Sequence, residues 1–311
     1  MRYRPLGKTD MRVSAVGFGA SPLGNVFGSV SESKAQRAVH AAIDGGINLL
    51  DVSPYYGHTI AEKRLGAALC GRRHSIYLAT KCGRYDLDGF DFSGQRIRTS
   101  VDESLRRLQT DYVDLLQAHD IEFGHLQQIV EETIPAMQEI QSQGKARFIG
   151  ITSYQLGMLA KIAKDTPVDT VLSYCRFNLL VDDMDSVLTP VLQRKSIGLL
   201  NASPLHMGII TRKGAPAWHP APETIKRAGA QIVQLCEDSG FNPAQVALRF
   251  CVDHPYVAST LVGMGTTQQV EDNLQALTVE LDPSLMAKME RLIAPVKNAI
   301  WASGLPENAD G

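Results

Sequence analysis

The sequence predicts a (β/α)8 barrel, in which eight parallel strands form a closed ring and eight helices surround it. Short apolar runs of strand length alternate eight times with longer segments of helical periodicity. Most of these runs are continuously apolar, which is typical of parallel strands buried on both faces. The chain has 311 residues, and a barrel of this kind typically takes ~250 or more.

Each element can be assigned in order along the chain. The predicted strands are 14–19, 47–51, 76–81, 112–119, 146–152, 169–173, 197–202 and 257–263. The predicted helices are 31–45, 59–70, 93–108, 125–143, 154–165, 184–195, 222–253 with a break at 240–243, and 267–277. A hairpin is expected at 3–13 and an additional helix at 283–294. Because no Pro/Gly/Ser-rich tract divides the chain, residues 1–311 are expected to form one domain.

A doubly wound nucleotide-binding fold is the alternative architecture, because segment 17–24 is rich in glycine and follows the first predicted strand. Its GxGxxG turn would need glycine at position 22, where Pro22 stands. Eight strand–helix pairs also exceed the six strands of that fold. The sequence therefore favours the barrel.

Composition excludes several classes of function. A net charge of -2 provides no basic field for nucleic acid or an anionic membrane. No apolar run approaches the ~20 residues that span a bilayer, and the N-terminus lacks the apolar core of a signal peptide. The five cysteines are scattered without a CxxC pair, which argues against disulfides and against a metal site. We expect a cytoplasmic, metal-free protein.

Three neighbouring strands end on ionisable residues, and this is the most informative pattern in the sequence. The second, third and fourth strands close with Asp51, Lys81 and His119, and Tyr56 follows Asp51 by five residues. Each residue alone has an ordinary structural explanation, such as a turn cap or a solvated strand end. Parallel strands, however, bring their ends to one rim, where barrel enzymes carry their active sites. Together the four residues predict a proton-transfer site.

Their chemistry is complementary. A phenol must lose roughly three units of its pKa, or about 4 kcal/mol, to work near neutral pH. An ammonium group ~4 Å away provides about 4 kcal/mol at an effective dielectric of ~20. We therefore expect Lys81 to lower the pKa of Tyr56, Asp51 to keep Lys81 protonated, and His119 to orient a substrate oxygen.

The chain resembles the aldo-keto reductases, whose Asp/Tyr/Lys/His tetrad matches Asp51, Tyr56, Lys81 and His119 in type, order and strand position. Further matching segments are 56–57, 61–62, 65–66, 104–108, 111–114, 144–145, 149–151, 203–205 and 272–273. The chain is most similar to those members that oxidise L-galactose at C1. Segments 17–24, 79–85, 119–124, 172–175 and 218–221 carry that closer similarity.

The resemblance implies an extended nicotinamide dinucleotide as cofactor. The nicotinamide is assigned to Thr152, Ser153 and either Ser173 or Tyr174. The pyrophosphate is assigned to Ser203, Leu205 and Gly208, where small residues let backbone amides approach closely. The adenosine is assigned to Gly263, Met264, Gly265, Gln269, Asp272 and Asn273. Gly19, Ser21 and Asp51 are further cofactor residues that the resemblance implies.

Two positions depart from the family pattern. An aromatic residue that stacks on the nicotinamide often precedes the Ser-Pro-Leu stretch, but Ala202 stands there. Members that use NADP carry a lysine and an arginine beside the 2′-phosphate, whereas this chain has Gly263 and Gln269. The second departure favours NAD.

The resemblance implies a small aldose as substrate, with L-galactose favoured. Candidate substrate residues are Tyr55, Tyr56, His119, Asp120, Glu122 and Trp218. L-fucose, D-arabinose and pyridoxal remain open as alternative substrates. A nucleotide-binding regulatory subunit with little catalysis is a further alternative, against which the intact tetrad speaks. We expect a monomer or a weak homo-oligomer.

Overall fold

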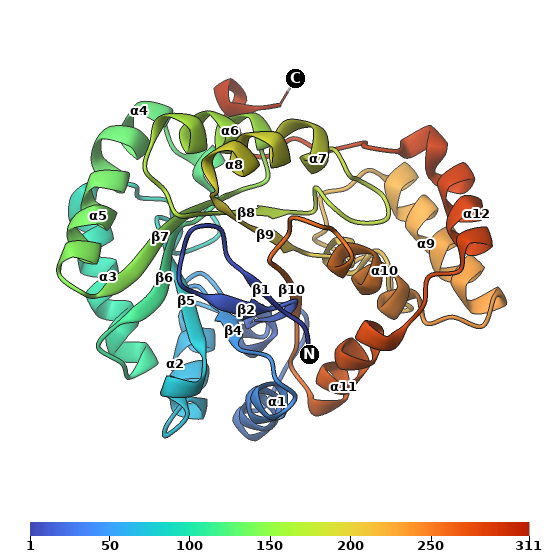
Figure 1. Cartoon of the computed structure of the whole chain (residues 1–311), viewed down its shortest axis with the longest axis horizontal. Helices are drawn as coiled ribbons and strands as arrows, with labels where there is room; N and C mark the ends of the chain where they lie inside the picture. The colour runs from blue at the N-terminus through green and yellow to red at the C-terminus, as the bar shows by residue number, and fades with distance from the viewer. Residues whose placement is uncertain (311) are drawn as a thin grey trace.

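The eight predicted strands close into one parallel barrel in the computed structural model, which describes residues 1–310 (Figure 1). In ring order they are β3 (Val16–Gly19), β4 (Leu49–Asp51), β5 (Tyr77–Cys82), β6 (Val113–Ala118), β7 (Ala146–Ser153), β8 (Thr170–Tyr174), β9 (Gly198–Ala202) and β10 (Ser259–Gly263). Strand β10 pairs with β3 and closes the ring. The predicted fold class is confirmed.

The helices surround the ring and lie within the predicted segments. They are α1 (Glu32–Asp44), α2 (Ile60–Ala68), α3 (Gly94–Leu108), α4 (Leu126–Gln128), α5 (Ile134–Ser142), α6 (Leu156–Asp165), α7 (Met184–Val187), α8 (Thr189–Lys195), α9 (Glu223–Asp238), α10 (Pro243–Val252), α11 (Thr267–Gln275) and α12 (Pro283–Ile293). Ser31, Ser93 and Asn242 cap the starts of α1, α3 and α10 with their side chains.

Two helices that were predicted as continuous are interrupted. The segment predicted at 125–143 contains a π-helical turn, η4 (Ile129–Thr133), between α4 and α5. The segment predicted at 184–195 is divided at Leu188. Pro135 and Pro190 stand at the second positions of α5 and α8. Because proline has no amide hydrogen, each removes one hydrogen bond of a continuous α-helix, which accounts for both interruptions.

An antiparallel hairpin closes the N-terminal end of the barrel. It consists of β1 (Tyr3–Pro5) and β2 (Arg12–Ser14). The prediction that Ser14 begins the first barrel strand is therefore wrong, because Ser14 pairs with Tyr3 in the hairpin. Leu6, Met11 and Val13 of the hairpin pack against apolar side chains inside the barrel. Figure 1 looks onto this end, with the dark blue hairpin lying across it. The opposite end carries the predicted site.

The register of the strands separates an apolar interior from a polar rim. Leu49, Ala79 and Leu115 pack in the inner cluster with the hairpin. Successive side chains of a strand alternate between its two faces. The residue two positions further along each of these strands therefore also points inward, at the C-terminal end of the barrel. These residues are Asp51, Lys81 and Gln117.

Residues 301–310, here called the tail, lie against the C-terminal end of the barrel. The Asp310 carboxylate accepts hydrogen bonds of 2.8 Å from the amides of Leu156 and Gly157 at the start of α6, and it also pairs with Arg176 at 2.8 Å. Trp301 stacks on Tyr154, with 4.5 Å between the ring centres. The tail is therefore attached to the same end as the site.

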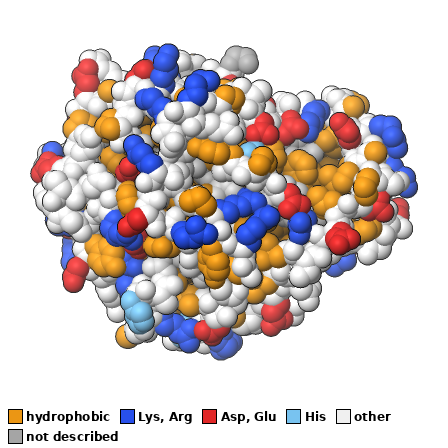
Figure 2. All heavy atoms as spheres, in the orientation of Figure 1, with side chains coloured by type: hydrophobic (Ala, Val, Ile, Leu, Met, Phe, Trp, Pro, Cys, Tyr) orange, Lys and Arg blue, Asp and Glu red, His pale blue; other side chains and the backbone are white. Residues whose placement is uncertain are grey.

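The outer surface is mixed in character. Figure 2 shows Lys and Arg side chains near the hairpin and a group of hydrophobic side chains over α9 and α12. Among the helices of residues 1–310, none has the length and apolar character needed to cross a membrane.

Candidate active site

A buried ion pair joins the ends of β4 and β5. Asp51 is 3% exposed and Lys81 is 2% exposed. The Lys81 Nζ donates to Asp51 Oδ1 and, at 2.9 Å, to the carbonyl of Val52. The second oxygen of Asp51 accepts a 2.8 Å hydrogen bond from Gln117. Burial by itself would lower the pKa of Lys81, but Asp51 and Tyr56 outweigh it and the pKa is raised. The lysine is therefore held in its charged form.

Tyr56 stands beside this pair on a tight turn. The next residue, Gly57, has a φ of +63°, and a Cβ there would lie 2.1 Å from the carbonyl oxygen of Gly24. Only glycine allows this close approach, which seats the turn against η1 (Ser21–Gly24). The Lys81 Nζ lies 5.0 Å from the centre of the Tyr56 ring, and the centre of the His119 ring lies 5.8 Å from it. The structure thus brings the four predicted catalytic residues together.

The pKa of Tyr56 is raised, although we expected from the sequence that Lys81 would lower it. Burial raises its pKa, Lys81 lowers it, and Asp51 and Asp120 raise it again, so that the pKa stands at about 12. Lys81 acts in the predicted direction. Its effect is outweighed because desolvation disfavours the phenolate and two carboxylates lie near.

His119 follows the last residue of β6 and is 5% exposed. Its Nδ1 lies 3.0 Å from the hydroxyl oxygen of Ser53, and its Nε2 lies 3.6 Å from Oδ2 of Asp120. Burial, Lys81 and Arg84 hold the pKa of His119 well below its usual value. The imidazole is therefore neutral at physiological pH and can donate one hydrogen bond.

A polar and aromatic cluster adjoins His119. Arg84 pairs with the buried Asp120, and its guanidinium lies 3.8 Å from the centre of the Tyr55 ring. The backbone amide of Asp120 donates a 3.0 Å hydrogen bond to Thr152 Oγ1. The predicted substrate residues Tyr55 and Asp120 therefore lie beside the tetrad.

Glu122 is also near this cluster, but none of its surface is exposed. Its carboxylate accepts hydrogen bonds from the hydroxyls of Ser153 at 2.7 Å, Tyr174 at 3.1 Å and Ser303 at 3.2 Å. Burial and the neighbouring Asp120 raise the pKa of Glu122 to about 7. The structure places Glu122 beneath the tail, where it connects the ends of β7 and β8 to Ser303.

Trp218, the remaining predicted substrate residue, lies on the loop between β9 and α9. It is 51% exposed, and its ring centre lies 5.7 Å from that of Phe27, on the loop between β3 and α1. Within residues 1–310, the ring contacts of Trp218 are with Phe27 and His219, and none joins it to the tetrad.

The residues assigned to the nicotinamide end the neighbouring strands β7 and β8. Tyr174 packs with the inner cluster, as Leu172 does, so the intervening Ser173 points outward. Register pairs Tyr174 with Ala202 of β9, and both contact the inner cluster. The Tyr174 ring therefore lies beside Ala202, the position at which family members often carry an aromatic residue.

The remaining cofactor positions follow the ends of β3, β9 and β10. Gly19 ends β3 and Ser21 begins η1, and Ser203 and Leu205 lead into η5 (His206–Gly208), which ends with Gly208. Gly263 ends β10, Met264 and Gly265 follow it, and Gln269, Asp272 and Asn273 lie in α11. Gln269 Oε1 accepts a 2.7 Å hydrogen bond from the amide of Gly265. Parallel strands place these loops at one rim.

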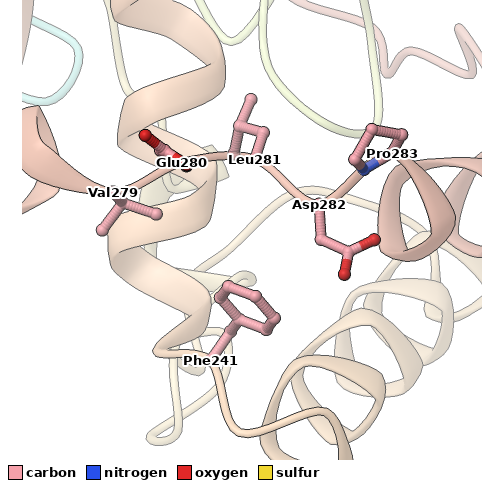
Figure 3. A pocket seen from close by; sticks show the side chains of 6 residues that line it. All are labelled: Phe241, Val279, Glu280, Leu281, Asp282 and Pro283. Atoms are coloured by element: carbon pink, nitrogen blue, oxygen red, sulfur yellow. The ribbon is translucent and has the colours of Figure 1, made fainter.

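Two surface hollows lie away from this rim. The first is lined by residues at the turn after α9 and at the start of α12: Phe241, Val279, Glu280, Leu281, Asp282 and Pro283 (Figure 3). Asp282 there accepts hydrogen bonds from the amides of Ser284 and Leu285 and so caps α12. The second is lined by residues of α3 and the turn after it, together with Lys145. Within residues 1–310, no three His, Cys, Asp or Glu side chains are grouped as metal ligands.

Three residues that lie at the site were not predicted from the sequence: Ser53, Arg84 and Gln117. Each follows or precedes a tetrad residue by two or three positions. Alternation along the strand could have identified Gln117, which stands two residues before His119 and shares its face. No such signal marks Ser53 or Arg84, because both lie in loops.

Comparisons with known proteins show the family to which the chain belongs. The family model described as "Aldo/keto reductase family" matches residues 15–294. The L-galactose dehydrogenase of Arabidopsis thaliana is 47% identical, with 99% of each chain covered. The D-threo-aldose 1-dehydrogenase of a Pseudomonas species is 27% identical over 90% of this chain and 94% of that one.

The solved structures agree as well. An aldo-keto reductase from Bacillus halodurans, solved in its holo form, superimposes with a TM-score of 0.81 at 28% identity, covering 97% of this chain and 99% of that one. A barrel with Asp51, Tyr56, Lys81 and His119 at one rim, matched by a family model over most of its length, belongs to the aldo/keto reductase family of oxidoreductases.

Proposed function

We propose that this protein is an NAD-dependent sugar 1-dehydrogenase that oxidises the C1 hydroxyl of L-galactose to the lactone. The observation that carries the proposal is the grouping of Tyr56, Lys81, Asp51 and His119 at one rim. The names of two relatives, L-galactose dehydrogenase and D-threo-aldose 1-dehydrogenase, support a sugar that reacts at C1.

In this proposal Tyr56 is the general base. As the phenolate, it accepts the proton of the C1 hydroxyl, and Lys81 stabilises the phenolate charge. Asp51 holds Lys81 in place, and Gln117 donates a hydrogen bond to Asp51. His119 donates a hydrogen bond to the C1 oxygen and so fixes its direction. A bound nicotinamide dinucleotide would supply the hydride acceptor.

The residues present fit such a cofactor. Helix α11 begins at the predicted adenosine site, and its first turn follows the loop of Gly263, Met264 and Gly265. Gly263 is exposed, so the backbone there is accessible to a ligand. The ring of Tyr174 beside Ala202 is our candidate for the aromatic surface against the nicotinamide. None of the six adenosine residues carries a positive charge, which favours NAD over NADP.

A steady-state assay of NADH absorbance tests the proposal. The panel contains L-galactose, L-fucose, D-arabinose and pyridoxal, with L-galactose expected to give the highest kcat/KM. The rate should rise with pH until Tyr56 ionises, because its pKa is raised to about 12 in the free protein. Tyr56→Phe should lower kcat by about 100-fold or more and leave the Kd for NAD within about twofold. A variant that keeps more than about a tenth of kcat would remove Tyr56 from this role.

Cofactor choice is measured with the same assay. Two missing charge-assisted hydrogen bonds to a 2′-phosphate, at roughly 1.5–3 kcal/mol each, predict a preference for NAD of about 100-fold or more in kcat/KM. Gly263→Lys with Gln269→Arg should reduce this preference, chiefly through KM for NADP. A Cβ at position 263 would lie 3.0 Å from Pro22, so Gln269→Arg alone is the matched variant without that contact. Equal use of both cofactors by the unmodified enzyme would contradict the assignment of the adenosine site.

A further inference from the structure

His119 lies between two polar groups that differ in kind. Its Nδ1 is 3.0 Å from the hydroxyl oxygen of Ser53, and its Nε2 is 3.6 Å from Oδ2 of Asp120. Ser53 and His119 are both buried. Tyr55, Tyr56, Lys81 and Arg84 are the other residues that face the ring or its charge. The surroundings of each ring nitrogen can therefore be examined separately.

The position of the single ring proton matters because the imidazole is neutral. Burial and the cations of Lys81 and Arg84 lower the pKa of His119 well below its usual value. A neutral imidazole has one nitrogen that donates and one that accepts. If Nε2 carries the proton, His119 can donate to a substrate oxygen on the Asp120 side of the ring. If Nδ1 carries it, Nε2 presents a lone pair there and repels that oxygen.

The hydrogen bonds of Ser53 decide which nitrogen carries the proton. The Ser53 oxygen already accepts a 3.1 Å hydrogen bond from the amide of Tyr55. Among residues 1–310, His119 Nδ1 is the only acceptor for the Ser53 hydroxyl hydrogen. With a proton on Nδ1, this buried hydroxyl would have to accept twice and donate to nothing, at a cost of about 1–3 kcal/mol. The hydroxyl therefore donates to Nδ1, and the ring proton lies on Nε2.

Asp120 favours the same assignment independently. A proton on Nε2 places positive charge density 3.6 Å from an oxygen of the Asp120 carboxylate, which is favourable. A lone pair on Nε2 would face that carboxylate and repel it. Arg84 pairs with Asp120 and keeps the carboxylate in its position. Both sides of the ring therefore select the same tautomer.

We propose that Ser53 is a positioning residue that donates its hydroxyl hydrogen to His119 Nδ1 and thereby fixes His119 as the Nε2–H tautomer, the form that can donate to the reacting oxygen of the substrate. In the neutral imidazole, the choice of tautomer stands on the geometry of Ser53, Tyr55, His119 and Asp120. Its consequence for turnover rests on the proposed function, in which His119 contacts the C1 oxygen. The two parts can fail separately.

The tautomer is measured on the whole protein without cofactor or substrate. Two-bond proton–nitrogen correlation spectra of protein labelled with 15N at histidine separate protonated from unprotonated ring nitrogens, and His119→Gln identifies the signals of His119. The expected result is a proton on Nε2 in the unmodified protein and a weaker preference for that tautomer in Ser53→Ala, in which Asp120 still favours it. Loss of a neutral hydrogen bond of about 1.4 kcal/mol corresponds to a change of about tenfold in the tautomer ratio. A proton on Nδ1 in the unmodified protein, or an unchanged ratio in Ser53→Ala, overturns the proposal.

Turnover is measured on the same variants. Ser53→Ala should lower kcat by about tenfold and leave the Kd for NAD within about twofold, and Ser53→Thr, which keeps the hydroxyl, should recover both the tautomer and kcat. Ser100→Ala is the matched control, because Ser100 is a buried serine whose hydroxyl donates to the carbonyl of Ile97 within α3. A change of tautomer without any change of kcat would support the role of Ser53 and contradict the contact of His119 with substrate. A fall in kcat without a change of tautomer would overturn the role of Ser53.

Discussion

Asp51 and Glu122 are both buried carboxylates near the C-terminal end of the barrel, but their partners differ in charge. Asp51 faces the ammonium group of Lys81 and the amide of Gln117. Glu122 accepts its hydrogen bonds from neutral groups, including the hydroxyls of Ser153, Tyr174 and Ser303. Two buried carboxylates in one molecule therefore differ in whether a cation compensates the negative charge.

The difference shows that burial alone does not decide what a carboxylate does. The negative charge of Asp51 raises the pKa of Lys81 against the effect of burial and so keeps a cation beside Tyr56. Without a cation, burial and Asp120 raise the pKa of Glu122 to about 7. The first carboxylate keeps the Lys81 cation beside Tyr56. The second changes its protonation near neutral pH and connects the tail to Ser153 and Tyr174.

The largest effect is expected when Asp51 loses its cation. Lys81→Met would leave a buried carboxylate unpaired, which typically costs about 3–5 kcal/mol of stability. The free energy of unfolding in urea measures this loss. The variant should also lose at least about 100-fold in kcat, and any remaining activity should move to higher pH, because the group that lowers the pKa of Tyr56 is gone.

The double variant Lys81→Met with Asp51→Asn is the control for this prediction. It removes both charges, so it should regain most of the lost stability and none of the activity. If Lys81→Met alone is as stable as the unmodified protein, Asp51 does not depend on Lys81 for its charge compensation.

A smaller, pH-dependent effect is expected at Glu122. Its pKa is raised in the folded protein from 4.5 to about 7, so between these values the folded state holds a proton that the unfolded state has lost. This contribution is full below pH 4.5 and is lost as the pH rises through about 7. Glu122→Gln cannot ionise, so its stability relative to the unmodified protein should rise by about 3 kcal/mol over that interval.

Urea denaturation of both proteins at several pH values between ~4 and ~8 measures this difference, because that range brackets the two pKa values of Glu122. Only the part of the difference that changes with pH is attributed to Glu122. A constant difference between the two proteins would mean that Glu122 keeps an ordinary pKa. The variant Gln117→Glu adds a carboxyl beside Asp51, the carboxylate whose charge Lys81 compensates. The same measurement on this variant extends the comparison from Glu122 to Asp51.

The smallest effect concerns a single neutral donor to Glu122. Tyr174→Phe keeps the ring and removes the hydroxyl that donates to Glu122 at 3.1 Å. The loss of stability should be about 2 kcal/mol where Glu122 is ionised and about 1 kcal/mol where it is protonated, because hydrogen bonds to charged groups are stronger. Thermal unfolding above and below neutral pH tests this.

Tyr256→Phe is the matched control, because Tyr256 donates at 2.7 Å to the neutral carbonyl of Ile197. Its loss should be the same at both pH values. A loss in Tyr174→Phe that is equally independent of pH would contradict a titrating Glu122.

The order of the strands and helices could be predicted from the sequence because it depends on local patterns. Eight apolar runs identified the eight barrel strands. At most strand ends, the predicted bound and the observed bound differ by one or two residues. The errors have local causes. Ser14 continues an apolar run but pairs with Tyr3 in the hairpin. Pro135 and Pro190 interrupt helices whose hydrophobic period continues past them.

The tetrad could also be predicted from the sequence, because parallel strands bring residues at their ends to one rim whatever lies between them. The environment of the tetrad could not. The pKa of Tyr56 depends on how deeply it is buried and on Asp120, from another strand end. The hydrogen bonds of the Glu122 carboxylate join residues up to 181 positions apart.

Sequence alone thus determined which elements form and which reactive groups share an end of the barrel, because strand periodicity and the polarity of a parallel ring are properties of the chain itself. Only the tertiary structure decided which carboxylate lies beside a cation, which nitrogen of His119 lies beside the Ser53 hydroxyl, and which carboxylate the tail covers. These outcomes depend on distances of a few ångströms between residues far apart in sequence, and Coulomb and hydrogen-bond energies change steeply over such distances.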